Sequence, residues 1–138
     1  MKIKKAIIVY YYEKTSSSRD CLKRVESALR SKGIFFRVVK RELLRPDMVR
    51  GTSLVISIGG DGTMLSAARC IIDKTPILGV NSDPEHKVGF LTTTNKEMFE
   101  HDLNMHLCGK SRIIGLSRLE ARIGKKRLSP ALNEVSIV

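Results

Sequence analysis

The chain alternates short apolar runs with segments of helical or polar character. Runs at 6–10, 34–39, 54–58 and 77–80 are rich in Ile, Leu and Val. Continuous runs of this kind are typical of strands that are buried on both faces of a sheet. We therefore expect four strands, each followed by a connection, with those at 6–10 and 54–58 buried.

Three of those connections carry helical patterns. The first helix is expected from the N-cap candidates at 15–18 to about residue 32, with Leu22, Val25 and Leu29 on one stripe and Gly33 as the stop. The second is expected over 64–72, and the third over 95–108. Pro46 would open a short helical turn within the connection at 41–52. Alternating strands and helices predict an α/β fold with a doubly wound, mostly parallel sheet.

The pattern changes after residue 111. Leu119, Ala121 and Ile123 alternate with polar residues, which predicts a strand with one buried face, and Gly124 predicts a turn into a return strand. We expect an α/β domain over 1–111 and the opening strands of an antiparallel β region over 112–138. So short a β region leaves open edges, so it would pack on the α/β part, pair within a homo-oligomer, or need a further C-terminal domain.

Composition narrows the function classes. The formal net charge of +11 would suit a polyanion, but the basic residues are scattered and only 5% of residues are aromatic. A nucleic-acid partner that needs a base-stacking surface is therefore not expected. The charge would also suit bound phosphates, or a solvated basic face without a specific role. No apolar run approaches the ~20 residues that span a bilayer, so we expect no membrane partner and a cytoplasmic location.

Cysteines and histidines show no metal-binding spacing. Cys21, Cys70 and Cys108 lie far apart on expected helices, and we expect them to be small buried hydrophobes. No residue is assigned to a metal.

A glycine-rich turn follows the third strand. Gly59, Gly60 and Gly62 would let a ligand approach the backbone closely, and the next helix would present its N-terminus to an anion such as phosphate. Asp61, among these glycines, would serve as a base for a hydroxyl or as a metal holder. The alternative is an ordinary strand–turn–helix corner with Asp61 as the helix N-cap. The turn matches neither a P-loop nor the dinucleotide fingerprint G-x-G-x-x-G.

The run GGDGT at 59–63 resembles the glycine-rich motif of the NAD kinases and of the diacylglycerol and sphingosine lipid kinases, and more distantly that of the phosphofructokinases. Three further segments are similar to the NAD kinase family in order and spacing: Gly-Val-Asn at 79–81, Gly-Phe-Leu-Thr at 89–92 and Ala-Leu-Asn-Glu at 131–134. The chain resembles the N-terminal domain of an NAD kinase with the first strands of the second domain. Its segment 82–85 is more similar to the branch that includes eukaryotic NADH kinases.

The resemblance implies a reaction and a set of site residues. The family transfers the γ-phosphoryl of ATP, or of polyphosphate in some members, to the 2′-hydroxyl of the adenosine ribose of NAD(H), with a divalent metal that we expect to be Mg²⁺. By this resemblance Asp61 is the catalytic residue that orients or deprotonates the hydroxyl. The implied nucleotide-binding residues are Gly59, Gly60, Gly62, Thr63, Asn81, Phe90 (near the adenine), Asn133 and Glu134.

Two alternatives stay open on the sequence. A lipid kinase catalytic domain shares GGDGT, and a non-catalytic nucleotide-binding fragment would carry the same motif. The sequence does not decide the phosphoryl donor, the choice between NAD and NADH, the oligomeric state, or whether this chain acts alone.

Overall fold

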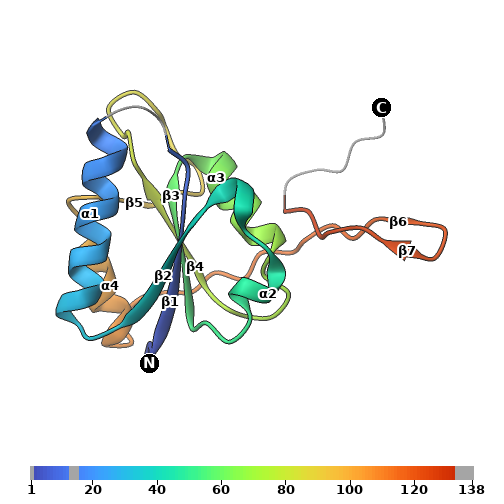
Figure 1. Ribbon diagram of the computed structural model, residues 1–138, viewed down its shortest axis with the longest axis horizontal. Helices are drawn as coiled ribbons and strands as arrows, with labels where there is room; N and C mark the ends of the chain where they lie inside the picture. The colour runs from blue at the N-terminus through green and yellow to red at the C-terminus, as the bar shows by residue number, and fades with distance from the viewer. Residues whose placement is uncertain (1, 13–15, 133–138) are drawn as a thin grey trace.

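A five-stranded parallel sheet forms the centre of the protein (Figure 1). The computed structural model describes residues 2–12 and 16–132. The strand order is β2-β1-β3-β4-β5, and each neighbouring pair is parallel. The strands are β1 (Lys5–Tyr10), β2 (Phe35–Lys40), β3 (Leu54–Gly59), β4 (Ile77–Asn81) and β5 (Thr94–Asn95). The predicted α/β class with a doubly wound parallel sheet is confirmed.

Strand β3 lies in the middle, and every residue of it is buried. Its neighbour β1 is buried from Ala6 to Val9. Both strands therefore need apolar side chains on both faces, which explains why their sequences are apolar runs, interrupted in β3 by the buried Ser57, and do not alternate.

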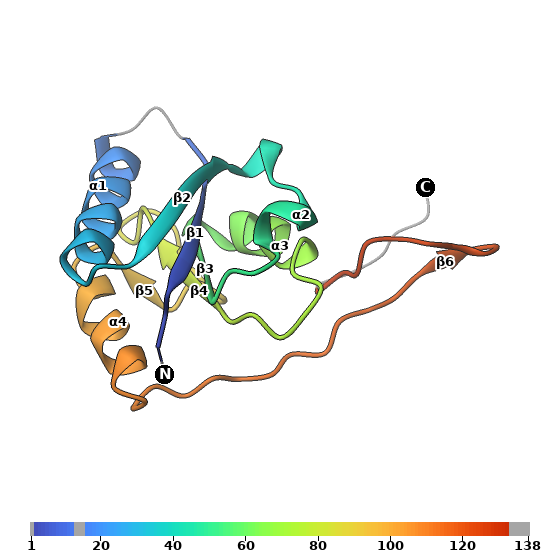
Figure 2. The same cartoon turned by 60° about the horizontal axis from the view of Figure 1, so that its bottom comes forward.

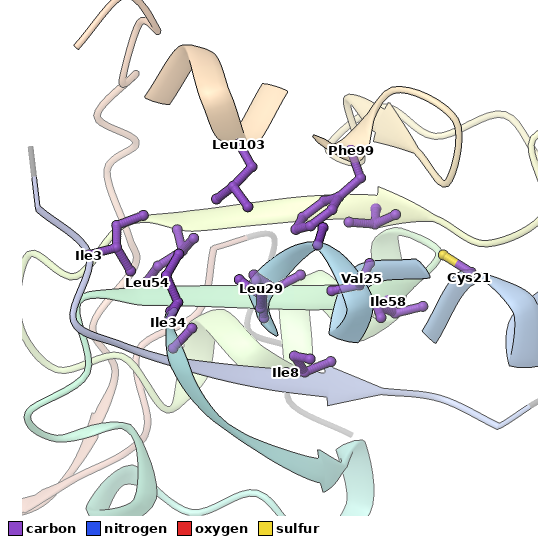
Figure 3. Packing of buried hydrophobic residues seen from close by; sticks show 14 residues of the cluster. Ile3, Ile8, Cys21, Val25, Leu29, Ile34, Leu54, Ile58, Phe99 and Leu103 are labelled. Carbon is purple, nitrogen blue, oxygen red and sulfur yellow. The ribbon is translucent and has the colours of Figure 1, made fainter. Parts of the chain in front are cut away.

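Helices cover both faces of the sheet. Helices α1 (Ser16–Ser31) and α4 (Phe99–Leu107) lie on one face, and α2 (Pro46–Val49) and α3 (Asp61–Arg69) lie on the other (Figure 1). On the first face Leu29 of α1 and the two α4 residues Phe99 and Leu103 pack with the β-strands (Figure 3). On the second face Ala67 of α3 packs with Val49 and Val55. The glycine turn between β3 and α3 is thus anchored by a buried strand and a packed helix.

Helices α3 and α4 start at other residues than the sequence predicted, and α3 also ends earlier, at Arg69 and not at 72. Helix α3 starts at Asp61, three residues earlier than expected, because the Met64 N–H already donates to the Gly60 carbonyl at 3.3 Å. The low helix propensity of the Asp-Gly-Thr start hid this from the apolar pattern. Helix α4 starts at Phe99 and not at Asn95, because the Asn95 side chain accepts the N–H groups of Glu97 and Met98 in a turn that precedes the helix.

One strand was not predicted. The two residues of β5 pair with the end of β4, Thr94 opposite Val80 and Asn95 opposite Asn81. A two-residue polar strand has no hydrophobic pattern by which it could be recognised. The predicted helical turn at Pro46 is confirmed as α2, and a 3₁₀ helix, η1 (Arg41–Leu43), precedes it.

The C-terminal hairpin extends away from the sheet (Figure 2). Strands β6 (Arg122–Ile123) and β7 (Lys126–Arg127) are antiparallel, with the turn at Gly124 as predicted. The prediction of a buried face was wrong: Leu119 is 53% exposed and Ile123 71% exposed. Because the hairpin projects from the molecule, neither of these side chains reaches the core. The boundary near residue 112 stays a prediction.

The cysteine prediction holds at one position only. Cys21 is buried on α1, but Cys70 and Cys108 are the C-cap residues of α3 and α4, half-buried and exposed respectively. In the part of the chain that the structure describes, no helix has both the length and the hydrophobicity to cross a membrane. The cytoplasmic location stays a prediction.

Candidate functional site

The predicted site residues that the structure describes, at 59–63, 81 and 90, meet at the carboxyl edge of the sheet. Strands β3 and β4 are neighbours, with Gly59 in register with Asn81, and the Ser82 N–H donates to the Gly59 carbonyl at 3.1 Å. The glycine turn therefore lies beside the start of the 82–92 loop. In doubly wound sheets this edge is where ligands bind.

The glycine turn is tight on one side and open on the other. Gly59 has φ +154°, and a Cβ there would collide with the side chain of Thr63, which is buried beneath the turn. A Cβ on Gly60 would meet nothing within 4 Å, so this side of the turn faces open space. The N–H groups of Asp61 and Gly62 precede the first intrahelical hydrogen bond and face no helix carbonyl. Such a turn can hold an anion by its backbone.

Asp61 connects this turn to the 90–92 loop. Its Oδ2 accepts the Phe90 N–H at 2.9 Å, and its Oδ1 accepts the N–H groups of Leu91 and Thr92 at 2.9 and 3.2 Å. The Thr92 hydroxyl donates to the same Oδ1 at 3.4 Å. Asp61 is thus not an N-cap, since Gly60 occupies that position, and its side chain holds the loop.

The environment of the Asp61 carboxylate favours its charged form. Partial burial acts to raise its pKa, but the hydrogen bonds from Phe90, Leu91 and Thr92 outweigh burial and lower the pKa below its usual value. The group is therefore ionised at neutral pH. Oδ2 accepts one hydrogen bond and keeps capacity for a second donor, such as a hydroxyl.

Asn81 shapes the neighbouring loop. Its Nδ2 donates to the Lys87 carbonyl at 2.8 Å, and its Oδ1 accepts the Asp83 N–H at 3.0 Å. The side chain is buried and committed to these two partners. Its predicted contact with a nucleotide stays a prediction.

Phe90 lies at the site with its ring in solvent. Its backbone is fixed by the bond to Asp61, whereas its side chain is 89% exposed. An exposed ring here offers an apolar surface to a flat ligand. The remaining predicted residues, Asn133 and Glu134, lie outside the described residues.

Two side chains at the site were missed on the sequence. Thr92 is buried and bonded to Asp61, and Arg41 lies beside Gly62, with Nη1 3.8 Å from the position of a Cβ on that glycine. Thr92 belongs to the matched segment 89–92 and could have been assigned from it. Arg41 lies in a connection without any motif. No group of three or more His, Cys, Asp or Glu side chains suited to a metal occurs within 2–12 and 16–132.

The fold and the site define a doubly wound α/β domain that carries, at the carboxyl edge of the sheet, a glycine turn suited to an anion and an aspartate bonded to the 90–92 loop. The profile of the ATP-NAD kinase N-terminal domain matches residues 6–110. This match covers most of the chain, so the protein belongs to the NAD kinase family.

Relatives of known name agree with this assignment. An NADH kinase of Arabidopsis thaliana is 31% identical over 138 aligned residues, which cover 88% of this chain and 43% of the relative. The human mitochondrial NAD kinase 2 is 44% identical over 71 residues, covering 51% of this chain and 16% of the relative. The chain thus spans less than half the length of these relatives.

A solved structure shows the same fold. The NAD kinase from Archaeoglobus fulgidus, determined in complex with ATP, superposes with a TM-score of 0.61 at 24% identity, over 84% of this chain and 40% of that one.

Proposed function

We propose that the protein is an NAD(H) kinase, or the phosphate-binding part of one. It transfers the γ-phosphoryl of ATP to the 2′-hydroxyl of the adenosine ribose of NAD(H) and so forms NADP(H). The observation that carries this proposal is the ionised Asp61 carboxylate at the start of α3, beside a glycine turn that faces open space. The names of the relatives, NADH kinase and NAD kinase 2, support it, as does the ATP bound to the structural neighbour.

In this proposal the 2′-oxygen attacks the γ-phosphorus. The bond between that phosphorus and the oxygen bridging to the β-phosphate breaks, ADP leaves, and the hydroxyl proton passes to Asp61. Oδ2 is the oxygen with room for the hydroxyl. Because the pKa of Asp61 is lowered, the carboxylate is a weak base. Its main effect is therefore to orient the hydroxyl, with the proton moving late, which suits the loose transition state of phosphoryl transfer.

The backbone of the glycine turn would hold the phosphates. Its free N–H groups and the N-terminal end of α3 place partial positive charge where phosphate oxygens gather. Mg²⁺, which neutralises phosphate charge, usually binds through one or two carboxylates together with the phosphates themselves. The described residues include no group of three or more side chains suited to a metal, so Mg²⁺ would bind together with ATP. Asp61 is the carboxylate of the glycine turn that could help to hold it.

The test combines binding with turnover. The purified chain is titrated with NAD, NADH and ATP by calorimetry and then assayed for NADP formation with Mg²⁺. Asp61→Asn is compared with Asp20→Asn, which removes an exposed carboxylate on α1. We expect product from the wild type, a loss of about 10²- to 10⁴-fold in Asp61→Asn, and no change in Asp20→Asn.

Each outcome has a distinct meaning. Binding without product would favour a nucleotide-binding fragment over a complete enzyme. Phosphorylation of diacylglycerol with none of NAD would favour the lipid kinase alternative, which the family match does not support. Full activity in Asp61→Asn would refute the role given to that residue.

A further inference from the structure

The positively charged side chain of Arg41 lies beside the glycine turn, although no sequence motif predicted it there. Arg41 begins η1, directly after β2, and the strand order β2-β1-β3 places it at the same edge of the sheet as the turn after β3. Its Nη1 lies 3.8 Å from the position a Cβ would take on Gly62. The guanidinium is therefore next to the first turn of α3.

Tyr11 holds this guanidinium in place. The Tyr11 N–H donates to the Ile58 carbonyl at 3.1 Å, so the residue that follows β1 is fixed to the end of β3. The Arg41 guanidinium carbon lies 3.9 Å from the centre of the Tyr11 ring. A cation stacked on an aromatic face keeps its orientation without using its N–H donors.

Those donors are weakly engaged among the described residues. The ion pair of Arg41 is with Glu42, at 3.7 Å between Nε and Oε1, which is too long for a hydrogen bond. In contrast, Arg45, four residues on, holds Asp47 with two nitrogens at 3.0 and 3.3 Å. Arg41 is thus oriented by packing, and within 2–12 and 16–132 no acceptor occupies its terminal nitrogens.

We propose that Arg41 is a further phosphate-binding residue of this site, presented by Tyr11 so that its guanidinium pairs in a bidentate manner with a nucleotide di- or triphosphate at the glycine turn. The inference rests on the proposed function and deepens it. The backbone of the turn offers only partial charges, whereas Arg41 adds a full positive charge in a planar fork that matches phosphate oxygens. The ligand that this arrangement of charges fits is therefore a pyrophosphate group and not an uncharged molecule that carries only hydroxyl groups.

The decisive variants are Arg41→Gln and Arg45→Gln, which remove the same charge from the same connection. Calorimetric titrations use inorganic pyrophosphate and ATP as probes. We expect Arg41→Gln to weaken the binding of both probes by about 10- to 100-fold, the usual range for a charge-assisted hydrogen-bond pair. Arg45→Gln, whose guanidinium is exposed and paired, should change binding by less than about 2-fold.

Variants of the Tyr11 ring and a conservative variant of Arg41 give an independent test. Tyr11→Leu keeps the charge but removes the ring, and should weaken pyrophosphate binding by about 2- to 5-fold, whereas Tyr11→Phe should bind as the wild type does. Arg41→Lys keeps a point charge without the fork, and should lie between the wild type and Arg41→Gln. If Arg41→Gln does not fold, as judged by thermal unfolding, these three variants decide the question.

Two results overturn the inference. Equal binding by Arg41→Gln and the wild type would do so, and so would equal losses in Arg41→Gln and Arg45→Gln, which would indicate a general charge effect. If the wild type binds ATP and NAD(H) in either case, the proposed function stands without Arg41. If the wild type binds no phosphate ligand at all, both the inference and the proposed function fail for this chain.

Discussion

Replacing Asp61 with asparagine removes one negative charge and turns one acceptor oxygen into an NH₂ donor. In the wild type the two oxygens accept three N–H groups, from Phe90, Leu91 and Thr92, and the Thr92 hydroxyl. If the asparagine oxygen takes the Oδ1 position, its NH₂ group faces the Phe90 N–H, donor against donor. If the amide is reversed, the NH₂ group faces two N–H groups, which is worse. Either arrangement loosens the 90–92 loop.

The size of the effect follows from these contacts. Hydrogen bonds to a charged group contribute about 1.5–3 kcal/mol each, and an unmade one costs a similar amount. Asp61 is partly exposed, so solvent screening reduces the sum. We expect the closed state of the loop to lose about 1–3 kcal/mol, while the global stability changes less, because the loop lies outside the core clusters. The open population should rise by about 5- to 150-fold.

Native-state hydrogen exchange measures this population directly. The amides of Phe90, Leu91 and Thr92 should lose protection in Asp61→Asn by that factor, while the β3 amides keep theirs. The matched control, Asp20→Asn, should leave the loop amides unchanged. Unchanged protection at 90–92 in Asp61→Asn would refute the reasoning, and the role of Asp61 would then be restricted to chemistry. The result also decides how a loss of activity in this variant is to be interpreted.

The same loop should respond to pH in a defined direction. The pKa of Asp61 is lower in the folded state than the roughly 3.9 of an unperturbed aspartate. Its stabilising contribution is therefore fully present above that unperturbed value and is lost as the pH falls through the folded-state pKa. Loop protection should decrease over this acidic range in the wild type and stay flat in Asp61→Asn. A loop that opens at the same pH in both proteins would contradict this assignment.

Three further predictions concern stability and reactivity. Gly59→Ala places a Cβ 3.0 Å from the Thr63 Cβ at φ +154°, so urea denaturation should show a loss of about 1–3 kcal/mol together with weaker ATP binding. Phe99→Ala empties a fully buried position under α4 and should cost about 3–5 kcal/mol by the same measurement. Burial raises the pKa of the Cys21 thiol to about 12, so at pH 8 iodoacetamide should label the exposed Cys108 first and Cys21 only on unfolding, as read by mass spectrometry.

The central part of the fold could be predicted because its strands are buried on both faces. A continuous apolar run such as 54–58 has few other interpretations when a glycine turn follows it. The edge of the sheet could not be predicted in the same way. Strand β5 consists of Thr94 and Asn95, whose place depends on pairing with β4 and not on hydrophobicity. The hairpin shows the opposite failure, since Leu119 and Ile123 alternate as a half-buried strand does and yet are exposed.

Only those parts of the site that are adjacent in the sequence could be predicted. The glycine turn and Asp61 are adjacent in sequence, so the motif identifies them together. The partners of Asp61 at 90–92 lie about thirty positions away in the sequence. The resemblance to the family identified this segment but did not predict that it contacts Asp61. Arg41 reaches the turn through the parallel order of three strands and the Tyr11 ring. A contact of that kind follows from topology and packing, which hydrophobic periodicity does not encode.

The two sides of the site, one suited to phosphate and one to a nucleoside, are held in different ways. Strand β3, helix α3 and Arg41 are fixed by the core or by a stacked ring, so the features suited to phosphate are rigid before any ligand arrives. The side suited to a nucleoside is different, because Phe90 is exposed and its loop is held to the body of the protein through Asp61. A hydroxyl that approaches Oδ2 must share the carboxylate with the Phe90 N–H. In the proposed function, substrate binding and loop position would thus be linked through one side chain, so that the order of the loop depends on the ionisation of the residue proposed to act on the hydroxyl.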